Sequence, residues 1–120
     1  YERAIVNQWL FFEQYDHEPT IAVARSWLGG YSPERAGKAT PEQMATWQDK
    51  GNRALGVMEQ RLANASWLAG DRYTVADISL YAYTHRAHEG GFDLARYPGI
   101  SAWIARVAAQ PGYVAMDWRP

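Results

Sequence analysis

The feature that most constrains the fold is a helix start at Thr74. Asp77 follows three residues later, so each side chain is spaced to accept a hydrogen bond from the other residue's backbone N–H, the pattern of a capping box. The negative charge of Asp77 also suits the positive end of the helix dipole. Tyr73 and Ile78 flank the box at the spacing of a hydrophobic staple. We therefore expect a helix directly after Thr74, and we assign Asp77 a structural role in preference to that of a catalytic acid.

Apolar residues elsewhere repeat at intervals of three and four, which is typical of one face of a helix. The repeat predicts four main helices: residues 3–28, broken near 16–18 by Pro19; residues 40–64; residues 75–88; and a helix from Pro98 to close to Pro111. A short fifth helix is expected in the tail at 112–120. No strand pattern is found. The predicted fold class is all-α, a helical bundle forming one domain over residues 1–120.

Three further local signals concern the second of these helices and the end of the first. Thr40, Pro41 and Gln43 form a second capping box with proline at the first helical position. Gly51 lies on the apolar face of that helix, where it costs about 1 kcal/mol relative to alanine. We expect a close helix crossing there. The pair Gly29–Gly30 is expected to end the first helix.

Charge and composition exclude several kinds of partner. A net charge of −1 and a pI near 6.3 favour neither nucleic acid nor an anionic membrane. The absence of cysteine excludes disulfides, thiolate zinc sites and cysteine nucleophiles. No apolar run approaches the roughly 20 residues that cross a bilayer. We expect a cytoplasmic protein, and the helical pattern at Tyr1, without an initiator methionine, suggests a fragment of a longer chain.

Three segments in order resemble the C-terminal helical domain of glutathione S-transferases of bacterial type. In chain order they are residues 3–13, the capping-box segment and residues 97–113. The matching positions of the capping-box segment are Leu68, Gly70, Thr74, Ala76, Asp77 and Leu80. The thioredoxin-like N-terminal half of that family is missing from this chain. In the family, that half binds glutathione and carries the thiol-activating residue, so the resemblance implies no catalytic residue and no activity in this chain alone.

The resemblance also implies where a substrate would lie. In the family, the inner face of the first helix borders a pocket for the hydrophobic substrate, and the tail often folds over it. The residues expected at that pocket are Phe12, Glu13, Tyr15, Asp16 and Trp118. The parent would use glutathione as co-substrate, need no other cofactor, and form a homodimer through its first two helices. The electrophile and the reaction, whether conjugation, peroxidation, reduction or dehalogenation, stay open.

Other interpretations remain beside this one. The chain could be a non-catalytic glutathione transferase-like interaction module, or a free ligand-binding domain. Asp16, His17 and Glu18 are interpreted as a solvated kink, with a place at the substrate cleft as the alternative. His85, His88 and Glu89 have the spacing of metal ligands on one turn, but no third distant ligand is evident. We therefore interpret this segment as the end of a helix, where positive side chains interact favourably with the helix dipole, and we expect no metal.

Overall fold

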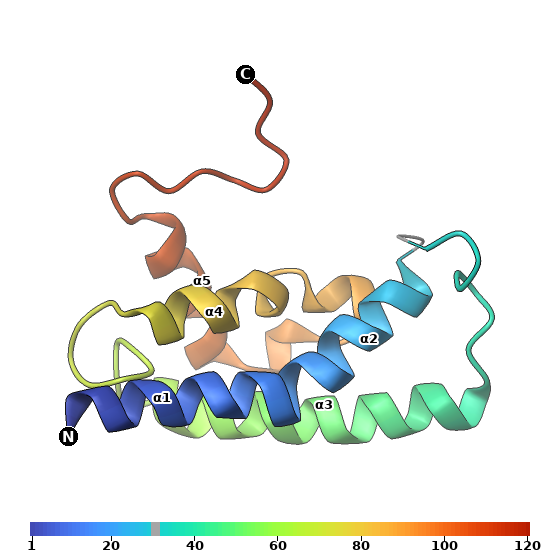
Figure 1. The fold of residues 1–120 in the computed structure, drawn as a ribbon, viewed down its shortest axis with the longest axis horizontal. Coiled ribbons are helices and arrows are strands. Elements are labelled where there is room, and N and C mark those ends of the chain that lie inside the picture. Colours follow the sequence, from blue (N-terminus) through green and yellow to red (C-terminus); the bar gives the residue numbers. More distant parts are fainter. Residues whose placement is uncertain (30–31) are drawn as a thin grey trace.

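The computed structural model describes residues 1–29 and 32–120, and in these ranges it contains helices and turns without a strand. The prediction of an all-α fold is confirmed. The α-helices are α1 (Glu2–Phe12), α2 (Glu18–Leu28), α3 (Pro41–Leu62), α4 (Val75–Thr84) and α5 (Pro98–Ala108). The first two run along α3 in the opposite direction, and α4 lies on their other side (Figure 1). The C-terminal tail leaves α5 and extends away from α3 (Figure 1).

The break predicted in the first helix is present as a π-turn, Glu13–His17, between α1 and α2. The backbone N–H of Glu18 donates to the carbonyl of Glu13 in this wider turn. Pro19 has no N–H to continue the regular pattern. The Thr20 hydroxyl instead donates to the carbonyls of Asp16 and His17, both at 3.0 Å. Gly29 caps α2 as expected, whereas Gly30 lies outside the described residues.

Helix α3 begins as predicted but uses its glycine differently. The Gln43 N–H donates to the Thr40 hydroxyl at 3.1 Å, and the Thr40 N–H donates to the Gln43 side chain at 2.8 Å. A Cβ built on Gly51 would lie 2.5 Å from ring carbons of Phe92 and 3.4 Å from Ile21 of α2. Helix α2 does approach α3 at Gly51 through Ile21, but the nearest group is the ring of Phe92, which comes from a loop.

The helix predicted at 75–88 is longer than the observed one, and the prediction of a short helix at 112–120 is wrong. Helix α4 ends at Thr84, and a 3₁₀ turn follows at Ala87–Gly90, closed by Gly91 in the left-handed region at φ 83°. The Phe92 N–H then donates to the Ala87 carbonyl, which turns the chain toward Gly51. The tail beyond α5 forms turns only, since its apolar residues, Val114, Met116 and Trp118, stay exposed and gain no packing from a helix.

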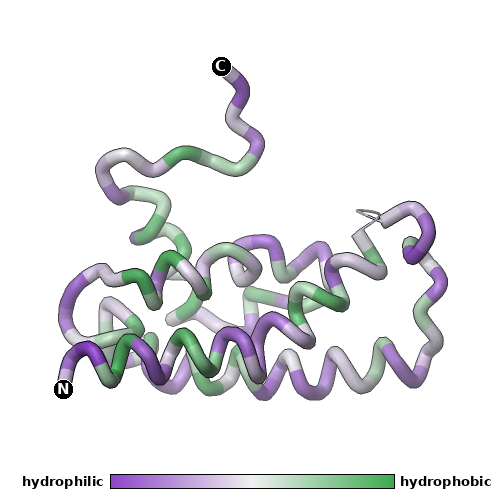
Figure 2. The backbone as a smooth tube through the Cα atoms, in the orientation of Figure 1, coloured by the Kyte–Doolittle hydropathy of each residue, from purple (hydrophilic) through white to green (hydrophobic). Residues whose placement is uncertain are grey.

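The core gathers where α2 to α5 meet. Its largest fully buried side chains include Trp103, Ile100, Ile21, Leu55, Met58, Leu68 and Leu80. Apolar and polar residues alternate along the helices at helical spacing, as the hydropathy colouring shows (Figure 2). Residues on the inward side of each helix therefore supply this core, and the outward side is left for solvent or for other protein surfaces.

The capping box at Thr74 has both of its reciprocal hydrogen bonds. The Asp77 carboxylate is fully buried and also accepts from the Leu68 N–H at 3.0 Å and from the Trp103 indole at 2.9 Å. The two residues expected to form the hydrophobic staple differ in their surroundings. Ile78 is 54% exposed, and the Tyr73 ring packs on Trp67 at 5.2 Å between ring centroids.

Candidate functional site

A pocket of about 540 Å³ lies between the kinked first helix and α3. One wall comes from the end of α1, the π-turn and the start of α2, and consists of Phe12, Tyr15, Asp16, Pro19 and Thr20. The other wall is one face of α3: Thr46, Trp47, Lys50, Arg53, Ala54 and Val57. The α3 residues share a face because they recur at intervals of three and four.

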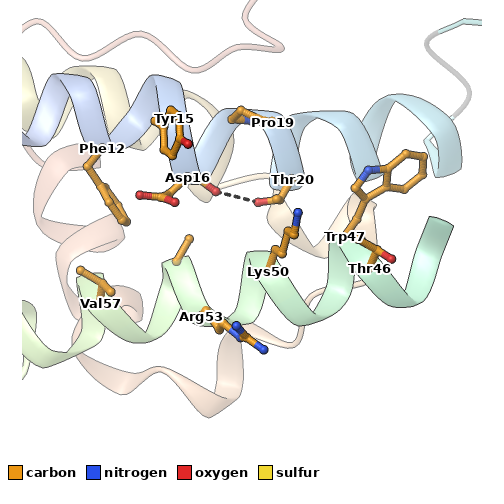
Figure 3. Close-up of a pocket in the computed structure, with 11 residues that line it drawn as sticks. Phe12, Tyr15, Asp16, Pro19, Thr20, Thr46, Trp47, Lys50, Arg53 and Val57 are labelled. Atoms are coloured by element: carbon orange, nitrogen blue, oxygen red, sulfur yellow. Dashed lines mark hydrogen bonds between the residues drawn. The ribbon is translucent and has the colours of Figure 1, made fainter. Parts of the chain in front are cut away.

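The pocket combines apolar walls with a few charges. The Phe12 ring and the Asp16 carboxylate project into the space between the two helices, and Lys50 reaches back toward α2 (Figure 3). Arg53 forms an exposed ion pair with Asp49 at 2.8 Å. An arrangement of aromatic and aliphatic surface with few polar groups suits a small, largely apolar ligand. The sequence analysis missed the α3 wall, although its helical repeat was visible.

The structure brings together three of the five residues expected at a substrate pocket. Phe12 is half-buried against Trp9, with ring centroids 5.4 Å apart, while the Tyr15 side chain is 83% exposed. Asp16 directly follows Tyr15 in sequence and lines the same wall. Glu13 does not line this pocket, because the π-turn directs it into the bundle, where it is 4% exposed and accepts from the Gln14 amide.

Trp118 is also absent from the pocket lining. The C-terminal tail that carries it extends away from α3 (Figure 1). The ring stays 62% exposed. A tail folded over this pocket, as the resemblance implied, is not the arrangement in this structure.

His17 is the side chain that sequence reasoning placed least well. The solvated kink is wrong for this residue, since His17 is fully buried and its Nε2 lies 2.8 Å from the Thr84 hydroxyl of α4. Its Nδ1 is buried without a hydrogen-bond partner among the described residues. Burial lowers the pKa of His17 to about 3, because a desolvated imidazolium is unfavourable. The residue is therefore neutral throughout the physiological range.

A second, shallower depression of about 370 Å³ lies along α2. It is lined by Glu18, Ala22, Val23, Arg25, Ser26, Arg35 and Tyr83. Its lining places two arginines and a glutamate around a small apolar patch. It shares no residue with the first pocket, so substitutions can separate the two.

His85 and Glu89, near the end of α4, have structural partners. His85 stacks on Tyr81 at 4.4 Å, and its Nδ1 lies 2.7 Å from the Tyr81 carbonyl. Glu89 pairs with Arg25 and Arg86. In the described part of the chain, no group of three or more metal-binding side chains comes together, and no helix is long and apolar enough to cross a membrane.

The comparison with protein families identifies the class to which this fold belongs. Residues 20–111 match the model of the glutathione S-transferase C-terminal domain. The chain therefore belongs to the glutathione S-transferase family and corresponds to its C-terminal helical domain. Both the capping box at Thr74 and the pocket wall on α3 lie inside the matched range.

Individual relatives agree with this assignment. A glutathione S-transferase structure from Xanthobacter autotrophicus Py2 is 48% identical, with a TM-score of 0.87, over 97% of this chain and 55% of that one. The disulfide-bond oxidoreductase YfcG of Escherichia coli (strain K12) is 28% identical over 92% of this chain and 49% of its own length. The chain thus spans about half the length of such relatives.

A third relative was crystallised with a glutathione conjugate. Ure2p5 from Phanerochaete chrysosporium, cocrystallised with 1-(S-glutathionyl)-2,4-dinitrobenzene, is 28% identical with a TM-score of 0.74. The match covers 92% of this chain and 52% of that one.

Proposed function

We propose that this chain is the C-terminal domain of a cytoplasmic, homodimeric glutathione transferase that conjugates glutathione to small electrophiles in detoxification. Its own contribution is the wall of the hydrophobic-substrate pocket, with Phe12, Tyr15 and Asp16 facing α3. The observation that carries the proposal is the pocket of about 540 Å³ between the two walls. That volume falls within the range of roughly 300–1,000 Å³ found for small-molecule sites.

Two considerations support an aromatic or otherwise apolar ligand. Phe12, Tyr15 and Trp47 provide ring surfaces on both sides of the pocket. The related Ure2p5 binds a conjugate of glutathione with a dinitrobenzene group, so this helical architecture is compatible with an aromatic adduct. Holding such a ligand beside an activated thiol would accelerate the reaction mainly by proximity. The activating group belongs to the half of the parent that this chain lacks.

The pocket can be tested on the chain itself with N-phenyl-1-naphthylamine, a neutral aromatic probe that fluoresces when bound. Phe12→Ala and Tyr15→Ala are each expected to weaken binding of the probe several-fold, because each removes aromatic contact area. Phe11→Ala is the matched control, since Phe11 is 75% exposed and does not line the pocket. If Val23→Ala weakens binding and Phe12→Ala does not, the ligand lies in the depression along α2 and the proposed wall is wrong.

The homodimer is proposed to use α1 and α3. No residue of α1 is fully buried, and apolar surface is exposed by Phe11 on α1, Tyr15 in the adjoining π-turn and Val57 on α3. Sedimentation equilibrium of the intact protein should give twice the mass of one intact polypeptide. Phe11→Asp should shift that protein toward monomer. A monomeric intact protein would contradict this part of the proposal.

A non-catalytic interaction module is the second candidate. The exposed apolar side chains of Val75 and Ile78 on α4 favour it, because they could contact another protein. Retention of the intact protein on immobilised glutathione separates the two candidates. A transferase should bind and elute with free glutathione, whereas an intact protein that flows through would favour the interaction module.

A further inference from the structure

The buried hydrogen bond between His17 and Thr84 joins the π-turn to α4. The Thr84 hydroxyl donates to the Leu80 carbonyl at 2.6 Å, so its oxygen is left to accept from the imidazole. The His17 Nε2, 2.8 Å from that oxygen, is then the protonated ring nitrogen. This assigns the neutral Nε2–H tautomer and leaves Nδ1 as the bare, buried acceptor.

The spacing of inward-facing residues explains why a π-turn lies at this point. Trp9, Glu13, His17 and Ile21 recur every four residues and face the bundle. A regular α-helix advances about 100° per residue, so a stripe with steps of four drifts by about 40° each time. The wider turn at Glu13–His17 absorbs this drift. His17 can therefore face α4 while Tyr15 and Asp16 face the pocket.

We infer that His17 is a positioning residue for the pocket. Its hydrogen bond to Thr84 holds the π-turn in the rotational setting that places Tyr15 and Asp16 in the wall opposite α3. Loss of the extra residue in this turn would rotate α1 relative to α2 by about 100° and remove that wall. The inference about ligand binding depends on the proposed function, whereas the inference about geometry does not.

The geometry is tested first, in the free chain, by backbone amide chemical shifts. Thr84→Val removes the acceptor with almost no change of shape, and Thr84→Ser keeps it. We expect Thr84→Val to shift the amides of Tyr15 and Asp16, and Thr84→Ser to leave them near their original values. Shifts confined to α4 and to His17 itself would overturn the positioning role. Nitrogen-15 shifts of the His17 ring should report the Nε2–H tautomer.

Ligand affinity is tested second, with N-phenyl-1-naphthylamine as the probe. His17→Gln keeps an amide donor at nearly the place of Nε2, whereas His17→Leu has none. We expect His17→Leu and Thr84→Val to weaken probe binding at least fivefold, and His17→Gln to stay within twofold of the original chain. Ile100→Val is the control for lost stability, because Ile100 is fully buried in α5 and does not line the pocket.

The outcomes separate the inference from the proposed function. Unchanged affinity in His17→Leu, together with a lowered melting temperature, would show that His17 only fills the core and would overturn the inference. Suppose that Thr84→Val shifts the amides of Tyr15 and Asp16, while Phe12→Ala leaves the affinity for the probe unchanged. This result would uphold the role of His17 in positioning the turn. In that case the probe binds elsewhere, and the proposed pocket is what fails.

Discussion

The indole Nε1 of Trp103 donates to the carboxylate of Asp77 at 2.9 Å, although the two residues lie on different helices and are 26 positions apart. The same carboxylate caps α4 and accepts from the Leu68 N–H. A residue recognised by its local capping pattern is thus also the point where α4, α5 and the preceding loop are joined. Its removal should affect all three.

Asp77→Ala should therefore destabilise the fold by more than the loss of a helix cap. It leaves the buried donors of Leu68 and Trp103 unpaired, and we expect the free energy of unfolding to fall by about 3–5 kcal/mol. Thr40→Ala, in the exposed capping box of α3, should cost only about 1 kcal/mol. Urea unfolding measures both. Equal losses would mean that the buried bonds of Asp77 contribute nothing beyond capping.

Two glycines of α3 should respond to alanine in opposite directions. Gly51→Ala places a Cβ 2.5 Å from the Phe92 ring and should destabilise the protein by about 1–3 kcal/mol. Gly56→Ala meets no described atom within 4 Å and should stabilise it by up to about 1 kcal/mol through helix propensity. Thermal unfolding of both variants provides the comparison. A stabilised Gly51→Ala would show that Phe92 moves aside freely.

Stability should fall in mild acid because of His17. Burial lowers its pKa from 6.5 to about 3, so between these values the unfolded chain binds a proton that the folded chain does not. The free energy of unfolding should then decrease by about 1.4 kcal/mol per pH unit as the pH falls from 6.5 toward 3, and this contribution should level off below 3. Above pH 6.5 the residue contributes no slope.

His17→Gln is the control for that pH dependence, because it cannot be protonated. Every other ionisable group is the same in both proteins, so the difference between the two stability curves isolates His17. Parallel curves between pH 4 and 7 would contradict a buried, neutral imidazole.

Kinetics of the intact protein should distinguish the two proposed substrates. Tyr15→Ala should raise the KM for the hydrophobic electrophile several-fold while leaving the glutathione KM nearly unchanged, since partial aromatic contact is worth less than the roughly 1.5–3 kcal/mol of full burial. Because Tyr15 is 83% exposed, the melting temperature of the Tyr15→Ala variant should barely differ from that of the original protein. Phe12→Ala should show the same split with some loss of stability, as Phe12 also packs on Trp9. A parallel rise of both KM values would refute the assignment.

The chain by itself should not turn over glutathione with an aromatic electrophile. The proposed thiol-activating group lies in the half that this chain lacks, and the pocket provides only binding surface. A spectrophotometric conjugation assay with the purified chain tests this directly. Turnover above the uncatalysed rate, abolished by Asp16→Asn, would place catalytic chemistry in this domain.

The sequence by itself determined the features whose partners are close along the chain. Thr40 with Gln43, and Thr74 with Asp77, form their bonds across three residues, so the starts of α3 and α4 follow from local pattern. Pro19 fixed the break in the first helix for the same reason, because a missing N–H acts on its own turn.

Tertiary structure decided which distant groups meet. The periodicity shows that Gly51 faces inward but cannot show that Phe92 fills its space, nor that Trp103 donates to Asp77. It also cannot show that the π-turn buries Glu13 and His17, since one extra residue rotates the face by about 100°. The spacing of the α3 wall residues predicts that they share one helical face. Only the packing of the kinked first helix opposite that face creates the pocket.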